Sequence, residues 1–242
     1  MDFSYRLKPV SDLTTTHRLP RVPSVDRVAF LRSMARGKRV IHAGFCGTEG
    51  YPHRSESLGG WLHGQLAAEA SELIGVDINR RGVEAAVHHG YEAVAADVRD
   101  KEALSALRLD PADVVIAGEL IEHLDDPGSF LDGAHVLVKP EGHLVLTTPN
   151  AHALRHTIAT LAGIETINPD HVALYSWYTL TNLVQRHGWT VRWFGTYHHS
   201  SARTARGRLV FGAQRLAARV RPFLAHGLIA ACSSQDGARS RR

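Results

Sequence analysis

Three ionisable residues follow one short apolar run of the chain, at a spacing that could support acid–base chemistry. The run is Val114–Ala117, and Gly118 separates it from Glu119, Glu122 and His123. If a helix begins after Gly118, positions i, i+3 and i+4 place both carboxylates and the imidazole on one helical face. Imidazole is a natural general base near neutral pH. Because open α/β sheets keep their ligands at the carboxyl ends of strands, this segment predicts an enzyme active site.

Apolar runs and helical patterns alternate from residue 39 to residue 147. The runs are short and almost wholly apolar, which is typical of strands that are buried on both faces. Their alternation with helices predicts an α/β fold in which a mostly parallel sheet has helices on both faces. The expected strands are Arg39–Ala43, Glu72–Val76, Glu92–Ala95, Val114–Ala117 and His143–Thr147, and the expected helices are Val25–Arg36, Trp61–Ala70, Arg81–His89, Lys101–Leu107 and Gly128–Val138.

The pattern changes after Pro149, where longer loops separate the elements. Helical spacing is seen over Ala151–Ala162, Trp177–His187 and Gly207–Val220, alternation typical of a strand over Thr190–Thr196, and a last apolar run over Gly227–Ala231. We therefore expect an N-terminal arm over residues 1–24, a single domain over residues 25–235 and a basic C-terminal tail over residues 236–242.

The composition is that of an ordinary globular protein. Of the 242 residues, 44% are hydrophobic and 21% are charged. No apolar run approaches the roughly 20 residues that a membrane-spanning helix needs, and the first residues lack the apolar core of a signal peptide. The only cysteines are Cys46 and Cys232, too few for a disulfide framework. These features predict a cytoplasmic protein with no transmembrane segment.

The net charge of +4 is unevenly distributed along the chain. From Tyr197 to the end there are nine arginines, no lysine and one acidic residue, Asp236. A basic segment of this kind could bind phosphate groups, nucleic acid or an anionic membrane surface. A solvated terminus that binds no partner is the alternative.

Three successive predicted strands end in groups that could bind a nucleoside. Gly44 and Gly47 follow the first strand, where glycine lets a ligand approach the backbone closely and tolerates positive φ. Asp77 ends the second strand and could accept hydrogen bonds from both hydroxyls of a ribose. Asp97 ends the third strand and could accept from an exocyclic amine such as that of adenine. Together, in this order, they predict a nucleoside pocket at one edge of the sheet.

The span from Arg39 to Trp193 resembles the class I S-adenosylmethionine-dependent methyltransferases. The likeness is greatest to the branch that includes quinone-biosynthesis O-methyltransferases and enzymes that methylate sugars and natural products. The matching motifs are Val40–Gly47, Gly75–Asp77, Ala96–Asp97, Glu119–Leu124, Leu137–Gly142 with Leu144–Asn150, Asn168–His171 and Leu180–Trp189. The resemblance implies a Rossmann-like, seven-stranded, mostly parallel sheet with an antiparallel last strand.

The resemblance also implies which residues bind the cofactor, S-adenosyl-L-methionine. Gly44 and Gly47 would border its methionine part, Asp77 would bind the ribose and Asp97 would bind the adenine amine. The full set that we assign to cofactor binding is Gly44, Cys46, Gly47, Asp77, Ile78, Asp97, Val98 and Glu119. The chain departs from the family at His42, where the family usually has an acid, and in the long polar loop Gly47–Ser57.

The segment Glu119–His123 would then lie between the methyl donor and its acceptor. Methyl transfer from a sulfonium requires alignment of the acceptor and, for a hydroxyl, removal of a proton. We expect His123 to be the general base, with His171 as a second candidate. Alternatively, Glu119, Glu122, His123 and His171 bind a divalent cation such as Mg²⁺ or Mn²⁺. In a third interpretation, Glu119 binds the cofactor, Glu122 caps a helix and His123 packs.

These features predict a methyltransferase that acts on a hydroxyl of a sugar, glycolipid or secondary metabolite. Residues of about 37–150 would bind the cofactor, and residues of about 150–225 would bind this small-molecule acceptor. One alternative is a metal-dependent RNA 2′-O-methyltransferase whose arginine-rich region binds phosphates, and another is a cofactor-binding protein without catalysis. A further hypothesis is peripheral contact with a membrane through Gly207–Leu224, a basic amphipathic segment. The sequence predicts neither the acceptor's identity nor the oligomeric state.

Overall fold

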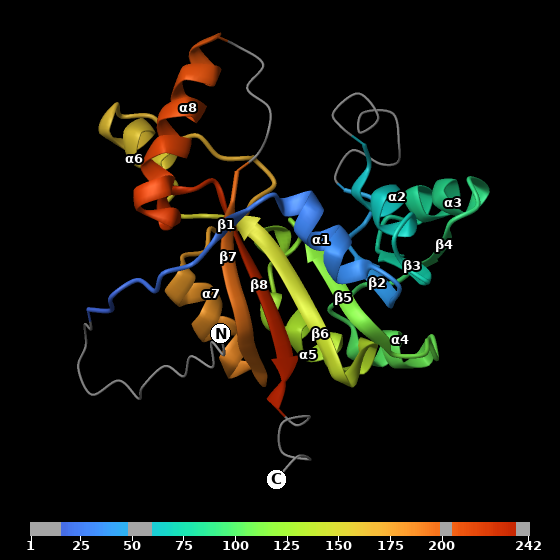
Figure 1. Cartoon of the computed structure of the whole chain (residues 1–242). Coiled ribbons are helices and arrows are strands. Elements are labelled where there is room, and N and C mark those ends of the chain that lie inside the picture. Colours follow the sequence, from blue (N-terminus) through green and yellow to red (C-terminus); the bar gives the residue numbers. More distant parts are fainter. Residues whose placement is uncertain (1–15, 48–59, 199–204, 236–242) are drawn as a thin grey trace.

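One mixed β-sheet forms the centre of the protein (Figure 1). The computed structural model describes residues 16–47, 60–198 and 205–235. The strands are β1 (Ser24–Val25), β2 (Arg39–Ala43), β3 (Glu72–Asp77), β4 (Glu92–Ala95), β5 (Ala112–Gly118), β6 (Val138–Pro149), β7 (Trp189–Tyr197) and β8 (Gly227–Ser234). Their order is β1-β7-β8-β6-β5-β2-β3-β4, and every pair is parallel except the two that β8 forms, with β6 and β7.

Side-chain caps fix the start of many helices. The helices are α1 (Arg27–Ala35), α2 (Leu62–Ala67), α3 (Arg80–His88), α4 (Lys101–Ala106), α5 (Pro127–Leu137), α6 (Leu154–Leu161), α7 (Trp177–Arg186) and α8 (Ala205–Val220), with short 3₁₀ turns η2 (Ile121–His123) and η3 (Pro222–Leu224). Asp26, Asn79, Asp100, Asp126 and Ser176 each accept a hydrogen bond from the backbone N–H three residues further on. Such caps satisfy backbone groups that the first turn leaves unpaired.

Within the described residues the sheet has eight strands, so the predicted number of seven is wrong, whereas the mostly parallel order and the antiparallel last strand are confirmed. The additional strand is β1, in which Ser24 and Val25 pair with the last two residues of β7. Val25, which the predicted helix included, therefore lies outside the observed helix α1, because Asp26 caps α1 and fixes where its first turn begins. Residues 1–15 of the predicted arm and the whole predicted tail lie outside the described residues, so the division of the chain stays a prediction.

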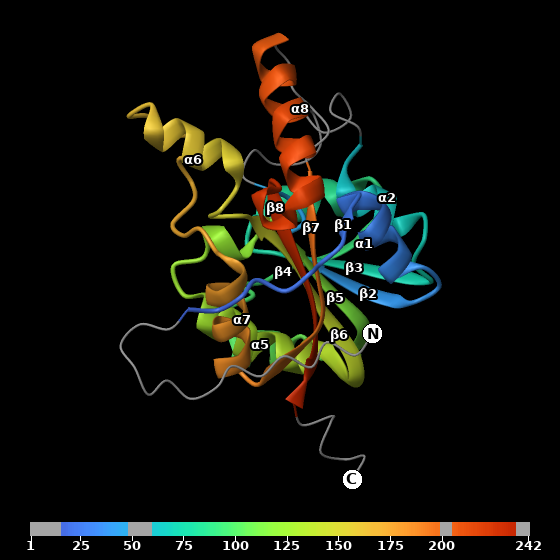
Figure 2. The same ribbon diagram turned by 60° about the vertical axis from the view of Figure 1, so that its left-hand side comes forward.

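The central strands bury both of their faces, which explains their near-continuous apolar sequences. Val115 of β5 contacts a core that includes Phe130 of α5 and Leu180 of α7. The next residue, Ile116, faces the opposite core with Leu31 of α1. All five side chains are fully buried, and each burial contributes about 1.5–3 kcal/mol. Figure 2 shows α5 and α7 on one face of the sheet and α1 on the other.

Strands β5 and β6 end at the same edge of the sheet, where Gly118 pairs with Thr147. Helices α6 and α8 stand beyond this edge, on the opposite side of β5 and β6 from α2 and α3 (Figure 1). The edge therefore has one group of helices on each side, and the residues that follow β5 lie between the two groups.

Both cysteines, Cys46 and Cys232, are buried free thiols, in keeping with the prediction that they form no disulfide framework. Within residues 16–47, 60–198 and 205–235, no helix combines the length and the apolar character that crossing a bilayer requires.

Gly227, the first residue of β8, has no room for a side chain. It lies opposite Tyr197 in the sheet, and a Cβ at this position would overlap the fully buried Tyr197 ring. Gly227→Ala should therefore lower the free energy of unfolding by about 2 kcal/mol, as overpacking commonly does. Gly212→Ala in α8 is the matched control, because no atom lies within 4 Å of the Cβ it would add. It should raise stability by roughly 0.5 kcal/mol or leave it unchanged. Urea unfolding compares the stabilities of the two variants, and equal effects would contradict the close packing of Gly227 against Tyr197.

Candidate active site

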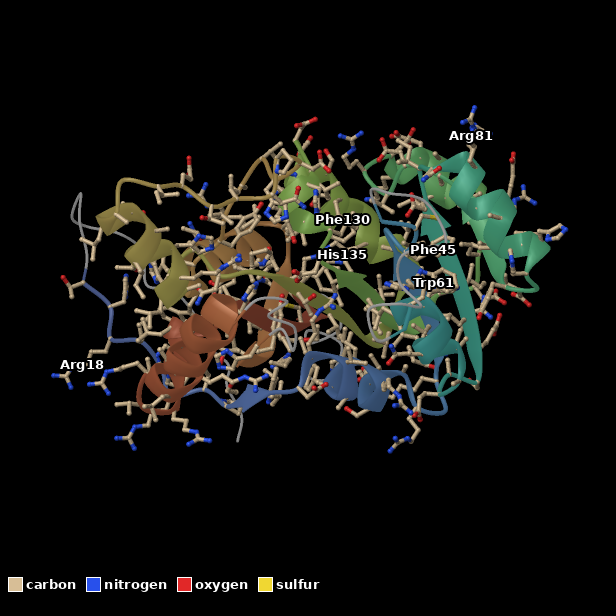
Figure 3. All side chains as sticks on the ribbon, turned by 90° about the horizontal axis from the view of Figure 1, so that it is seen from above. Arg18, Phe45, Trp61, Arg81, Phe130 and His135 are labelled. Carbon is tan, nitrogen blue, oxygen red and sulfur yellow. The ribbon has the colours of Figure 1, made fainter. Side chains whose placement is uncertain are left out.

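A cleft of about 760 Å³ opens where β2, β3, β4 and β5 end. All eight residues predicted to bind the cofactor line it, although they follow four different strands. They are Gly44, Cys46, Gly47, Asp77, Ile78, Asp97, Val98 and Glu119. Phe45 and Trp61 add an aromatic wall, visible in Figure 3, and the Trp61 indole N–H donates to the Phe45 carbonyl at 3.1 Å. The structure thus brings the predicted set together around one cavity.

The carboxylate of Asp77 fixes the turn after β2. Its Oδ2 accepts a hydrogen bond from the Cys46 backbone N–H at 2.8 Å, and its Oδ1 accepts from the Asn79 N–H at 2.9 Å. Gly44 and Gly47 in this turn have φ of +70° and +67°, which residues with a side chain adopt only with strain. Each carboxylate oxygen keeps a second acceptor position. Asp77 can therefore shape the turn and still accept from a ligand in the cleft.

The carboxylate of Asp97 already has a charged partner. Arg99 donates to it from Nη2 at 2.7 Å and from Nε at 3.0 Å, and the Arg99 backbone N–H donates to Oδ1 at 2.9 Å. The guanidinium holds the pKa of Asp97 below its ordinary value, so the carboxylate is charged at neutral pH. Arg99 lines the same cleft and was not identified in the sequence. A ligand amine would therefore approach an ion pair rather than a lone carboxylate.

Glu119 does not share a helical face with Glu122 and His123, so this prediction is wrong. Its backbone has a φ of +57°, in the left-handed region, and only a short 3₁₀ turn, η2, follows. The reason lies in the sheet, because the Glu119 N–H still donates to the Thr147 carbonyl at 2.9 Å. The chain can leave the sheet only after this bond, and a left-handed residue makes the turn at a cost of about 1–2 kcal/mol.

The Glu119 side chain ends in a polar network at the edge of the sheet. Its Oε1 accepts from the Tyr197 hydroxyl at 2.5 Å and from the Thr147 hydroxyl at 3.1 Å. Arg27 of α1 donates from Nε to the same Thr147 oxygen at 3.0 Å. Burial, together with the charge of Glu119, raises the pKa of Tyr197 well above its ordinary value, so the phenol keeps its proton and donates. Sequence reasoning missed Arg27, Thr147 and Tyr197, because they come from elements far apart in the chain.

Glu122 is completely buried although it has a carboxyl group. Its Oε2 accepts from the Thr148 hydroxyl at 2.9 Å, whereas its Oε1 has no hydrogen-bond partner among the described residues. Burial and, next, the charge of Glu119 raise the pKa of Glu122 to about 8. The group therefore holds a proton at neutral pH. Acids perturbed in this way are concentrated at functional sites.

His123 and His171 meet beside Glu122. One ligand atom from each of the three residues lies within 4.8 Å of the others, and the two imidazole ring centres are 4.7 Å apart. The Val172 N–H donates to the Glu122 carbonyl at 2.9 Å, which holds the loop of His171 against η2. The structure thus brings together three of the four predicted metal ligands. Glu119 is not among them, because its carboxylate is directed to the polar network.

The tautomer of His123 follows from its neighbour. Its Nδ1 lies 3.1 Å from the Asp170 carbonyl oxygen, which can only accept, so Nδ1 carries a proton and Nε2 is the nitrogen that can act as a base. His123 also lines the cleft. Burial and, next, the electrostatic effect of His123 lower the pKa of His171, so the second ring is neutral at pH 7. This geometry provides one base at the wall of the cleft.

His42, at the position where the resemblance led us to expect an acid, forms a pair with His63, and both rings are buried. His42 lines the cleft, and its Nδ1 lies 3.2 Å from Nδ1 of His63. Desolvation lowers the pKa of both rings, to about 4 for His63, so both are neutral at pH 7. A hydrogen bond between two like nitrogens requires that one ring donates and the other accepts. The cleft therefore has an uncharged wall at this point.

A mostly parallel sheet with a glycine turn, two strand-end acids and a base around one cleft is the architecture of a methyltransferase. The profile of the methyltransferase domain family matches residues 58–192, and the protein belongs to this family. A solved S-adenosylmethionine-dependent methyltransferase from Archaeoglobus fulgidus has the same fold, with a TM-score of 0.53, 19% identity and coverage of 84% of this chain and 92% of that one. The small RNA methyltransferase HEN1 also shares the fold, with a TM-score of 0.54, 18% identity and coverage of 91% of this chain and 27% of that one.

The protein is also similar to the ubiquinone biosynthesis O-methyltransferase of Ralstonia nicotianae. The two are 32% identical over 147 residues, which are 59% of this chain and 57% of the relative. The chain thus spans little more than half the length of that relative. The predicted resemblance to S-adenosylmethionine-dependent methyltransferases, including the quinone-biosynthesis branch, is confirmed.

Asp77→Asn should weaken binding of S-adenosylhomocysteine by ten- to a hundredfold, about 1.4–2.8 kcal/mol. The amide cannot accept from both Cys46 and Asn79, so one backbone N–H would lose its partner and the glycine turn its support. Isothermal calorimetry measures the affinity. Asp100→Asn is the matched control, because this exposed residue only caps α4 and asparagine caps equally well. Equal affinity of the two variants would show that Asp77 does not shape the cofactor site.

Proposed function

We propose that the protein transfers the methyl group of S-adenosyl-L-methionine to a hydroxyl group of a small-molecule acceptor. The observation that carries this proposal is the convergence of the eight predicted cofactor residues on one cleft whose wall includes His123. The sulfonium of the cofactor supplies an activated methyl group. The relative named as a ubiquinone biosynthesis O-methyltransferase supports a hydroxyl as the accepting group.

The donor would lie across the strand ends, with Asp77 toward its ribose and the Asp97–Arg99 pair toward its adenine. The Asp97–Arg99 pair offers both acceptors and donors to the base edge, and Asp77 offers acceptors to the sugar hydroxyls. Phe45 and Trp61 would exclude water from this side of the cleft. This orientation directs the methyl group toward the segment that contains His123.

His123 would remove the proton of the acceptor hydroxyl. Because Nδ1–H donates to Asp170, Nε2 is the nitrogen available to take a proton, and His171 packs edge-on against the ring and restricts its rotation. An in-line displacement requires no more than this base and a fixed acceptor. Glu122 and His171 are both uncharged at neutral pH, so a proton that arrives on His123 meets no adjacent positive charge from them.

His123→Asn should lower kcat by 10²- to 10⁴-fold, because asparagine places an amide donor near the position of Nδ1 but has no base. Affinity for S-adenosylhomocysteine should stay within about twofold. Chromatography of the S-adenosylhomocysteine formed from S-adenosylmethionine measures turnover over a panel of catechols, sugars and polyols.

His88→Asn on α3 is the matched control, since this exposed ring lies outside the cleft. Undiminished turnover of His123→Asn would exclude His123 as the base. Binding of the cofactor without turnover of any acceptor in the panel would favour the hypothesis of a non-catalytic protein.

A metal-assisted version of the reaction is the second candidate, and the buried Glu122 Oε1, which has no hydrogen-bond partner among the described residues, favours it. Glu122, His123 and His171 would hold a divalent cation, and a carboxylate with two imidazoles suits Mn²⁺ or a similar ion. Such a cation, when bound, promotes ionisation of a coordinated hydroxyl. The three protein ligands leave other coordination positions for the acceptor, and the Asp170 carbonyl orients the His123 ring for either role.

Unfolding as a function of pH separates the two versions. Without a cation, wild-type stability should fall by roughly 2–4 kcal/mol from pH 5 to pH 9, since the pKa of Glu122 is about 8 in the folded protein and near 4.5 when unfolded. Because the pKa of Glu122 is raised on folding, its contribution to stability is complete at a pH below its pKa in the unfolded chain. That contribution is lost as the pH rises through its pKa in the folded protein. Glu122→Gln should show no such loss. Stabilisation of wild type, but not of Glu122→Gln, by Mn²⁺ over EDTA would establish the metal site; no effect on either would leave His123 as an unassisted base.

A further inference from the structure

Arg155, in the first turn of α6, is a cation without a hydrogen-bond partner among the described residues. It makes no hydrogen bond or ion pair with the residues that the structure describes, and its Nε is shut off from solvent. Burial lowers the pKa of Arg155, and the opposing effects of Tyr197 and Glu119 do not offset it. A guanidinium nitrogen that is cut off from solvent without a hydrogen-bond acceptor is destabilising, so its presence requires an explanation. A ligand that supplies a negatively charged acceptor is one such explanation.

The surroundings place Arg155 beside the donor cleft but outside it. Its electrostatic neighbours include Glu119, Tyr197 and His171, all at the carboxyl edge of the sheet. Arg155 is not among the residues that line the donor cleft, whereas Glu119 is. In Figure 1, α6 lies on the opposite side of β5 and β6 from α2 and α3, which border that cleft. Arg155 therefore stands on the side from which an acceptor would approach His123.

The next residue, His156, shows the same deficiency. Its Nε2 is also buried and without a hydrogen-bond partner among the described residues. Burial lowers the pKa of His156, and the ionisable neighbours that also shift this pKa are Arg155, Glu165 and His171. Glu165 is exposed and is not among the groups that shift the pKa of Arg155, so its carboxylate does not neutralise the guanidinium. Two adjacent side chains thus offer buried nitrogen atoms that have no hydrogen-bond partner among the described residues, and a guanidinium has donors only.

We infer that the acceptor has an anionic oxygen group, a carboxylate or a phosphate, and that Arg155 and His156 bind it while its hydroxyl faces His123. This inference rests on the proposed function and adds the charge of the acceptor and the residues that select it. A guanidinium binds either group with two parallel N–H···O bonds, which fixes orientation as well as position. An uncharged acceptor would leave the guanidinium unpaired and would be bound more weakly.

The test is thermal unfolding of the full chain loaded with S-adenosylhomocysteine, at constant ionic strength. Benzoate and phenyl phosphate are the anionic probes, and benzyl alcohol is the neutral one. At least one anion should raise the midpoint of wild type, and the one that does distinguishes carboxylate from phosphate; benzyl alcohol should have no effect. Arg155→Met should raise the midpoint without a ligand, because it removes a buried Nε that has no hydrogen-bond partner among the described residues, and should lose the response to the anion.

Two further variants control for charge and for the fold. Arg155→Lys keeps the charge without the planar fork, so it should bind the anion at least threefold more weakly than wild type and still respond. Arg81→Met, at an exposed site on α3 that points away from the molecule in Figure 3, should behave as wild type.

Three outcomes would overturn the inference: no shift of wild type with either anion, a full response of Arg155→Met, or a lower midpoint of Arg155→Met without ligand. The last would show that Arg155 has a structural partner. Failure of the proposed function is distinguishable, because S-adenosylhomocysteine would then not stabilise wild type before any anion is added.

Discussion

The hydrogen bond from the Tyr197 hydroxyl to the Glu119 carboxylate joins two strands that are not neighbours in the sheet. It fixes the end of β5, and the left-handed backbone of Glu119 directs the chain into η2. That turn fixes the positions of Glu122 and His123. It also fixes the loop of His171, because the Glu122 carbonyl accepts a hydrogen bond from the Val172 N–H. Because the network is buried, each of its bonds is stronger than in water, which offsets the strain at Glu119.

Most ionisable groups around this turn are uncharged at neutral pH, for the same physical reason. Desolvation favours the neutral form of each group. Tyr197 and Glu122 therefore keep their protons, and the rings of His171 and His42 stay unprotonated. The few full charges therefore act over longer distances than they would at a hydrated surface. A methyl donor with a positive sulfonium would meet, in Glu119 and Asp77, two acids of the cleft that form no ion pair with an arginine among the described residues.

The sequence predicted those parts of the site that follow directly from one strand end. Asp77 and Asp97 could be identified because the residue after a buried parallel strand must lie at the ligand edge. Arg99 could have been found as well, since an arginine two residues after the acid can reach back to it. Tyr197 and the turn at Glu119 could not, because they depend on strand register and on a contact between residues 78 positions apart. The short strand β1 was missed because its pairing partner, the end of β7, comes more than 170 residues later.

The order of strands has a consequence for how the chain acquires its structure. β8 lies between β6 and β7, so the sheet consists of two separate pieces until residues 227–234 are available to join them. During synthesis, the edges of β6 and β7 that β8 later covers present unpaired backbone groups and apolar side chains. Open edges of this kind favour pairing with other chains, and long-range closure is slow. A chaperone that shields these two edges would therefore improve the yield of folded protein more than one that protects the cofactor-binding strands.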